Sequence, residues 1–263
     1  LDVDGKPMLE DRWSVKPDFW RAPTDNDYGA GLQNRFRAWK DPEMKLKSIE
    51  CTEVEAAKQV KAVYDMPRLE ATLTMTYTLN VKGELIVNES LDVNEEAKHK
   101  PHLMRFGMQW VMPKSYSIVN YYGMGPGENY IDRNNATRLD VYTQKVSEQY
   151  WGYVRPQESG KKTQVRYWRM LDANGCGLQF SAMGEMECSA LPYLAEDLDD
   201  GPRKEAQHSH SGDLIERNFT VVKLAARQMG MGCVNSWGAW PRGEYQVPYK
   251  DYQFTYMVSP ITK

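Results

Sequence analysis

The stretch 72–79 alternates between threonine and larger apolar residues, and this alternation constrains the fold more than any other feature of the sequence. Successive side chains of a β-strand point to opposite faces of the sheet. The alternation therefore places four threonines on one face and four apolar residues on the other, namely Leu73, Met75, Tyr77 and Leu79. Threonine and tyrosine also favour extended backbone. The stretch predicts a half-buried strand.

This strand is followed by a turn and by more of the same pattern. Residues 81–84 are typical of a hairpin turn, and the apolar residues at 85–87 and 91–93 indicate a returning strand beside the first. Alternating apolar residues recur along the rest of the chain, at 104–110, at 165–167, around Phe180 and at 252–258. We therefore expect strands from end to end, with a meander at this point.

Helical spacing is confined to one segment. Leu32, Phe36 and Trp39 are spaced as on one face of a helix, and the residues at 24–27 have side chains suited to a helix N-cap or a turn. We expect one short helix over 31–40. Strands without helices of about 10 to 15 residues between them favour antiparallel sheets packed face to face. The predicted fold class is all-β, a sandwich rather than a βαβ fold.

Length and composition limit the class of protein. The chain has 263 residues, of which 41% are hydrophobic and 26% charged, as in globular proteins with a sizeable core. Its formal net charge is -3 without basic runs, so no nucleic-acid partner is expected. No stretch approaches the roughly 18 apolar residues of a membrane span, and residues 1–5 do not resemble a signal peptide. We expect a soluble protein without a membrane partner, and leave the cytoplasm and the periplasm open.

The domain organisation is predicted from the absence of repeats and linkers. We expect a single domain over residues 1–263, and we interpret the polar stretch 196–212 as a long surface loop inside it. The sequence begins at Leu1, in what reads as mid-sequence. We therefore interpret the chain as a fragment of a longer protein.

Two groups of residues resemble parts of metal sites. Asp25 and Asp27 begin like a calcium loop, but Phe36 stands where such a loop needs a glutamate. His208 and His210 lie two apart but have no third ligand at suitable spacing, so we interpret them as surface or hydrogen-bonded side chains. The same interpretation applies to the other two histidines, His99 and His102. We predict no metal site in this chain.

Other catalytic patterns are weak. Glu128 and Asp132 form a carboxylate pair of the kind that a glycosidase needs, but Arg133 is adjacent, so we interpret the pair as salt-bridged groups that shape a loop. No nucleophile elbow, P-loop or dinucleotide-binding motif is found. The cysteines lie too far apart for a disulfide framework, and we expect free thiols at Cys51, Cys176, Cys188 and Cys233. No catalytic residue is predicted.

Two tryptophans lie in an unusual segment. Residues 230–241 surround Trp237 and Trp240 with glycine, serine, asparagine and proline, which places these rings better on a loop than in a core. The chain as a whole has 8 Trp and 16 Tyr against 6 Phe, and amphipathic rings of this kind can pack one face on a sugar and hydrogen-bond its hydroxyls. We expect Trp237 on a loop at one end of the sandwich, at least partly accessible.

Four ordered blocks give the chain a family resemblance. Residues 19–29 (Phe-Trp-Arg-Ala-Pro-Thr-Asp-Asn-Asp-Tyr-Gly) resemble the opening signature of the C-terminal, small-chain domain (domain 5) of β-galactosidases of glycoside hydrolase family 2. Three later blocks resemble motifs of that domain in the same order, at 123–133, 153–160 and 229–238. The resemblance covers essentially the whole chain.

The resemblance implies a fold and a function. The fold is an antiparallel β-supersandwich of the galactose-mutarotase-like type. The parent enzyme hydrolyses terminal β-D-galactosides with retention, using two glutamates on a barrel domain that precedes this one, so the isolated chain is expected to be inactive. The substrate-binding residue implied here is Trp237 at the mouth of the galactoside pocket, with supporting loop residues at Asn235, Ser236 and Trp240.

The resemblance also implies the partners of the domain. A β-galactoside is expected at the interface with the barrel domain of the same chain, and a homo-oligomer of the full-length enzyme is left open. No cofactor is expected in this domain, while magnesium and sodium are left open for the parent enzyme. Two alternatives remain: a free-standing carbohydrate-binding module, and an aldose mutarotase with His208 or His210 as base and Glu128 as its partner.

Overall fold

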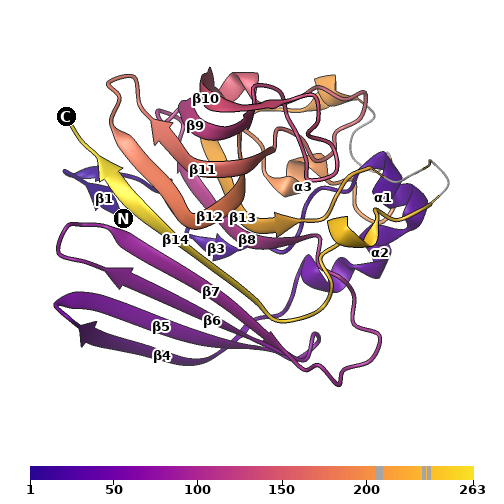
Figure 1. Cartoon of the computed structure of the whole chain (residues 1–263), viewed down its shortest axis with the longest axis horizontal. Helices are drawn as coiled ribbons and strands as arrows, with labels where there is room; N and C mark the ends of the chain where they lie inside the picture. Colours follow the sequence, from indigo (N-terminus) through magenta and orange to yellow (C-terminus); the bar gives the residue numbers. More distant parts are fainter. Residues whose placement is uncertain (205–209, 233–234, 236–237) are drawn as a thin grey trace.

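The computed structural model describes residues 1–204, 210–232, 235 and 238–263 (Figure 1). Most of the regular secondary structure is β-strand. The strands are β1 (Asp2–Val3), β2 (Lys6–Pro7), β3 (Lys16–Pro17), β4 (Lys45–Val54), β5 (Ala57–Met66), β6 (Ala71–Leu79), β7 (Leu85–Val93), β8 (Arg105–Pro113), β9 (Ile118–Gly125), β10 (Arg138–Lys145), β11 (Lys162–Leu171), β12 (Gly177–Leu191), β13 (Phe219–Gln228) and β14 (Tyr252–Ile261).

The helices are short. The α-helices are α1 (Asp25–Ala30), α2 (Leu32–Arg35) and α3 (Ala195–Leu198), and the 3-10 turns are η1 (Arg37–Trp39), η2 (Val146–Glu148), η3 (Ser211–Asp213) and η4 (Gly243–Tyr245). In Figure 1, α1 and α2 lie at the right-hand end of the molecule, and both chain termini lie at the left. Among the described residues, no helix is long and apolar enough to cross a membrane.

One large antiparallel sheet forks at β12. The main path of the sheet runs β10-β9-β11-β12-β14-β7-β6-β5-β4, and a branch from β12 runs through β13 and β8 to β3. The first part of β12 pairs with β14 through Gly177–Ala182, and its last part pairs with β13 through Glu187–Leu191. One strand therefore belongs to two layers, and the all-β antiparallel fold predicted from the sequence is confirmed.

The core lies between these layers. Trp110 of β8 donates from its indole nitrogen to the hydroxyl of Tyr256 of β14 over 2.9 Å, and its ring meets Phe180 of β12 edge to face. On β6, Leu73 and Met75 are fully buried, as the alternation predicts, while Leu79 at the end of the strand is 44% exposed. The apolar faces identified from the sequence thus form the contact between the layers.

Strand β8 differs from a half-buried strand because both of its faces are buried. Phe106 and Trp110 face the core, and Arg105 and Gln109 on the opposite face are also almost inaccessible. On this second face, the side chain of Arg105 contacts Asp18, which directly follows β3, and Glu158. Alternation in the sequence indicates one buried face, and the second is buried by a segment about ninety residues away.

The expected helix over 31–40 is only partly correct. Helix α1 begins earlier, at Asp25, because Thr24 caps it and Asp27 completes a capping box with Thr24. Gly31, with φ of 71°, ends α1 and separates it from α2. This left-handed conformation is easy for glycine, and it explains why the helical pattern does not form one continuous helix.

The interpretation of 196–212 as a surface loop is wrong for its first part. Asp199 and Asp200 are each about 2% exposed. Asp199 accepts a hydrogen bond from the indole of Trp20 over 2.8 Å and forms an ion pair with Lys40. Buried carboxylates need such partners, so this part of the segment is attached to the body of the domain. Residues 205–209 lie outside the described part of the chain.

Candidate functional site

The segment after β13 carries the residues that the sequence analysis singled out. The structure describes residues 229–232, 235 and 238–241 of this segment. The predicted substrate-binding residue Trp237 lies outside the described residues, and so do Ser236, Val234 and Cys233. Asn235 is exposed, and Trp240 is half-buried. The geometry of the site is therefore described at the two ends of this loop, the first at residues 229–232 and the second at residues 238–241.

Arg21 holds the carbonyl side of the first end. Its side chain is fully buried, and its guanidinium donates to both carboxylate oxygens of Asp27, over 2.8 and 3.0 Å. The same guanidinium donates to the carbonyl oxygens of Met229 over 2.8 Å and Gly230 over 3.2 Å. Arginine suits this position because its planar fork can satisfy a carboxylate and two carbonyls at once. The block at 19–29 therefore fixes a segment some 208 residues later in the chain.

Asp132 holds the amide side of the same end. Its carboxylate accepts hydrogen bonds from the amide of Met231 over 3.1 Å and from the amide of Gly232 over 2.7 Å. The approach is so close that a Cβ atom at Gly230 would lie 2.5 Å from the Asp132 carboxylate. Asn26 completes this end by donating to the carbonyl of Met231 over 3.1 Å.

Trp240 holds the second end of the loop. Its ring meets Phe36 and His102 edge to face, with centroids 5.3 and 5.7 Å apart, and Arg35 lies 5.8 Å from its centroid. Trp240 lies outside the helices and strands, as expected, but its half-buried indole packs against the core at Phe36, directly after α2, which the sequence did not predict. Burial lowers the pKa of His102, which favours a neutral imidazole against this ring.

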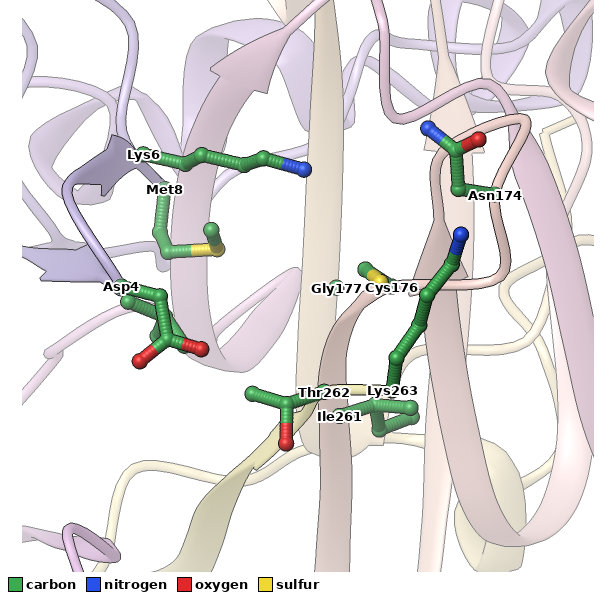
Figure 2. Close-up of a pocket in the computed structure, with 10 residues that line it drawn as sticks. Asp4, Lys6, Met8, Asn174, Cys176, Gly177, Ile261, Thr262 and Lys263 are labelled. Carbon is green, nitrogen blue, oxygen red and sulfur yellow. The ribbon is translucent and has the colours of Figure 1, made fainter.

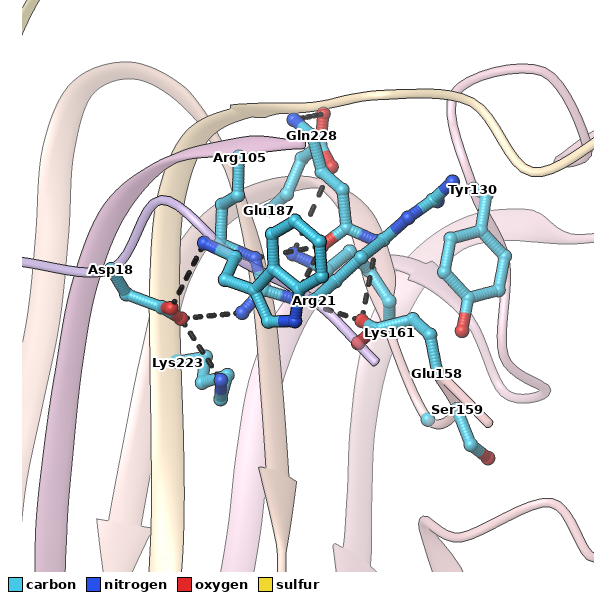
Figure 3. Close-up of polar contacts among 12 residues, drawn as sticks. Asp18, Arg21, Arg105, Tyr130, Glu158, Ser159, Lys161, Glu187, Lys223 and Gln228 are labelled. Atoms are coloured by element: carbon cyan, nitrogen blue, oxygen red, sulfur yellow. Dashed lines mark hydrogen bonds and ion pairs between the residues drawn. The ribbon is translucent and has the colours of Figure 1, made fainter. Parts of the chain in front are cut away.

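A buried polar network lies beneath the first end (Figure 3). Arg105 of β8 forms ion pairs with Asp18 and, over 2.9 Å, with Glu158, while Lys223 of β13 contacts Asp18 over 3.0 Å. Burial alone would raise the pKa of Asp18, but Lys223 and Arg105 hold it well below its usual value. Gln228 joins the network by accepting from Arg105 and donating to Glu158. The network connects β8 and β13 to the segments at 18–21 and 158–161.

Lys161 and Glu187 complete the network less tightly. The ammonium of Lys161 lies 3.9 Å from Glu187 and has no exposed surface. Burial lowers the pKa of Lys161 and raises the pKa of Glu187, so both shifts oppose the charged form of the pair. The two groups are therefore buried near each other without a hydrogen bond between them.

Glu128 shapes the neighbouring loop, as interpreted from the sequence. Its carboxylate receives Arg133 over 2.6 Å and the amide of Gly160 over 2.8 Å, and it also contacts the hydroxyl of Tyr153. Burial and this carboxylate raise the pKa of Tyr153 to about 12. A carboxylate with so many donors stabilises the loop between β9 and β10 rather than acting on a ligand.

The metal and thiol interpretations concern the remaining candidates. Asp27 pairs with Arg21, and His210 and His99 are exposed, while His208 lies outside the described residues. Within the described ranges, no group of three or more His, Cys, Asp and Glu residues is arranged to hold a metal ion. The described cysteines are free thiols, as expected for Cys51, Cys176 and Cys188, and Cys233 lies outside the described residues.

A cavity of about 360 Å³ lies at the opposite end of the molecule (Figure 2). It is bordered by Lys6, Asn174 and Cys176 and by the final residues at 261–263. The ammonium of Lys6 forms an ion pair with the carboxylate of Asp172 over 3.6 Å. Asn235 and Trp240, the described residues among those predicted for sugar binding, do not line this cavity.

The sequence analysis missed the side chains that hold the loop. It identified the blocks at 19–29 and 123–133 but assigned them only a general structural role. The usable signal was the pairing of an arginine with an aspartate six residues later, which Arg21 and Asp27 provide. The contact of Arg21 with Met229 was not accessible from the sequence because the two segments are far apart in the chain.

Together these features define an antiparallel β-sandwich domain with a glycine-rich loop clamped at one end by buried charged side chains. Domains of this class present a loop from a rigid scaffold. The chain belongs to the family described as beta galactosidase small chain, whose model matches residues 1–258. The resemblance identified from the four sequence blocks is confirmed.

Two relatives illustrate the extent of the match. The chain is 32% identical over 268 residues to a beta-galactosidase of Halalkalibacterium halodurans, covering 99% of this chain and 25% of that protein. It is 34% identical over 248 residues to a beta-galactosidase of Lactobacillus delbrueckii subsp. bulgaricus, covering 92% of this chain and 23% of that protein. The chain therefore spans about a quarter of the length of the curated relatives that it matches.

Comparison of structures finds more distant neighbours. A galactose mutarotase related enzyme from Lactobacillus acidophilus aligns with 86% of this chain and 73% of its own, at 7% identity and a TM-score of 0.40. This level of similarity adds nothing to the fold described above.

Proposed function

We propose that this chain is the small-chain domain of a retaining β-galactosidase of glycoside hydrolase family 2. In this proposal the complete enzyme hydrolyses terminal β-D-galactosides, and the domain completes the sugar pocket from one side. The two catalytic glutamates belong to a barrel domain outside residues 1–263. The chain itself contributes no catalytic residue and, in isolation, does not turn over substrate.

The observation that carries this proposal is the match of the family model to residues 1–258. The relatives named beta-galactosidase are about four times as long as the matched region, which is consistent with a domain that works with others. Retention requires two carboxyl groups about 5 to 5.5 Å apart. Glu128 and Asp132 do not serve as such a pair here, because one is bound by Arg133 and Gly160 and the other by the amides of Met231 and Gly232.

We assign substrate contact to Trp237, on the loop between the two anchored ends. A loop that contacts a ligand benefits from fixed ends, because ordering fewer residues on binding costs less entropy. Arg21 and Asp132 supply one fixed end, and Trp240 supplies the other. Asn235 and Ser236 belong to the same loop and support Trp237. The partner of this face is the barrel domain of the same polypeptide.

The experiment compares the isolated chain with the complete enzyme. The purified chain should not cleave a chromogenic β-galactoside above background, whereas the complete enzyme should. Turnover by the isolated chain that a single carboxylate substitution abolishes would contradict the proposal. Mutarotation of galactose is measured on the same sample, because catalysis of that reaction would instead assign the chain to the aldose mutarotases.

The role of Trp237 is tested separately. Trp237→Ala in the complete enzyme should weaken substrate binding or change acceptor preference, because a stacking face is lost. The same substitution in the isolated chain should leave the melting temperature nearly unchanged. A large drop in melting temperature with unchanged kinetics would show that Trp237 is a packing residue and that its assignment is wrong.

A further inference from the structure

A recess separate from the loop opens on the second face of β8. Its volume is about 160 Å³, which is room for roughly five water molecules. The recess lies between the segment at 16–20, the link from η1 to β4 and the start of α3. Residues 229–232, 235 and 238–241, the described part of the loop segment, do not line it.

The floor of the recess is a row of polar side chains. Gln109 of β8 pairs with Lys16 of β3 on one side and with Lys223 of β13 on the other, so the three side chains share one face. Asp18 lies beside this row and contacts Lys223 over 3.0 Å. The floor thus presents an amide, two ammonium groups and a carboxylate within the span of three strands.

Gln109 has an unused donor. The side chain is 3% exposed, and its amide nitrogen has no hydrogen-bond partner in the structure. A buried donor without a partner costs about 1 to 3 kcal/mol, so such groups are rare and call for an explanation. A ligand hydroxyl in the recess would provide the missing acceptor.

The walls of the recess are apolar and held in place. They include Trp20, Trp39 and Met44. The indole of Trp20 donates to Asp199 over 2.8 Å, and that of Trp39 donates to the carbonyl of Pro101 over 2.9 Å. Apolar walls with a few fixed polar groups are the usual composition of a small-molecule site.

The charges around the recess are balanced. Lys223 is paired with Asp18, and Lys40 at the rim is paired with Asp199 over 2.6 Å. Glu196 and the exposed Lys16, which also line the recess, carry opposite charges. A charged ligand would disturb these pairs, whereas a neutral polyhydroxylated ring can both accept from the amide and ammonium groups and donate to the carboxylate.

We propose that this recess is a second sugar-binding site, which takes one edge of a neutral monosaccharide ring with Gln109 donating to a hydroxyl. The floor of the site is formed by β3, β8 and β13. The inference does not rest on the function proposed above, because it uses none of the described residues of the loop.

The test is a titration of the chain with methyl β-D-galactopyranoside and with D-glucose, followed through the indole N–H signals of Trp20 and Trp39 in NMR spectra. We expect saturable shifts of these two signals with at least one of the sugars. Gln109→Leu should weaken the binding about tenfold or abolish it. Gln149→Leu removes a similarly buried amide outside the recess and should leave the binding unchanged.

Two further variants keep the result clear. Lys16→Glu changes an exposed residue that lines the recess and should also weaken binding, which covers the case in which Gln109→Leu alters folding. Trp237→Ala should leave the shifts unchanged, whatever it does to the activity of the complete enzyme. The proposal is overturned by an absence of shifts with both sugars, by shifts that persist in Gln109→Leu, or by a response to inorganic phosphate alone.

Discussion

The indole nitrogen of Trp110 lies 2.9 Å from the hydroxyl oxygen of Tyr256 and donates a hydrogen bond to it inside the apolar core. The two residues stand on β8 and β14, which belong to different layers of the sandwich. Burial raises the pKa of Tyr256 far above its usual value, so the hydroxyl remains a neutral acceptor. A single polar contact therefore fixes the position of one layer against the other.

Removing this hydroxyl should destabilise the domain. Tyr256→Phe leaves the buried indole N–H of Trp110 without a partner, and we expect a loss of about 1 to 3 kcal/mol in the free energy of unfolding. Urea denaturation measures it. Tyr122→Phe, at a half-exposed tyrosine of β9, is the matched control and should have little effect. Equal losses of unfolding free energy in both variants would show that the hydrogen bond between Trp110 and Tyr256 contributes no stability of its own.

Arg105 should be among the most sensitive positions in the chain. Arg105→Met leaves Asp18 and Glu158 buried with fewer cations, and breaking one partner of a buried ion pair costs about 3 to 5 kcal/mol. The melting temperature and chemical denaturation should both report the loss. Lys58→Met breaks an exposed pair with Glu53 and should produce no measurable change. A stable Arg105→Met protein would show that the network is dispensable.

The buried carboxyl group of Glu89 should lower the free energy of unfolding at neutral pH. It is fully buried, neither carboxylate oxygen has a hydrogen-bond partner in the structure, and burial, helped by Asp18, raises its pKa well above the usual value. The folded state keeps this proton while the unfolded chain releases it, so stability falls as the pH rises above about 4.5. The slope is at most about 1.4 kcal/mol per pH unit.

Glu89→Gln removes this dependence. We expect the variant to be more stable than the parent chain at pH 7 and nearly equal to it at pH 4, as measured by urea denaturation at both pH values. A variant that is less stable at pH 7 would mean that the carboxylate is charged and paired in solution.

Gly230 should tolerate no side chain. A Cβ atom would lie 2.5 Å from a carboxylate oxygen of Asp132 and 3.0 Å from Cβ of Tyr245, so Gly230→Ala should cost about 1 to 3 kcal/mol. Gly152→Ala is the control, because nothing lies within 4 Å of its Cβ position. If the clash with Asp132 is the cause, adding Asp132→Ala should recover part of the loss, so the two effects should not be additive. Thermal melts of Gly230→Ala, Gly152→Ala, Asp132→Ala and the double variant test this.

The sequence predicted the local parts of the fold well. The alternation at 72–79 became β6, and the turn at 81–84 joins it to β7 in the expected antiparallel register. These features depend on neighbouring residues, and the spacing of side chains along a strand is visible in a sequence. The bounds of the helices were harder to predict from the sequence, because they depend on two single residues: Thr24 caps the start of α1, and Gly31 ends it.

The site could be predicted only in outline. The segment around Trp240 was found from its composition, but its packing against Phe36 and His102 was not, because nothing local links these residues. The clamp by Arg21 joins segments more than two hundred residues apart. Contacts of this kind arise from the order of strands in the sheet, and a single sequence carries little information about that order.

The fork at β12 has a consequence for synthesis of the chain on the ribosome. Strands β4 to β7 can pair as soon as they emerge, but β14 must insert between β7 and β12 before the two halves of the main sheet are joined. β14 comes last among the described strands, so the facing edges of β7 and β12 both stay open until β14 has been made. Unpaired edges of this kind invite association with other chains. The domain is therefore most vulnerable to aggregation while it is being made, and this exposure ends only when residues 252–261 are in place.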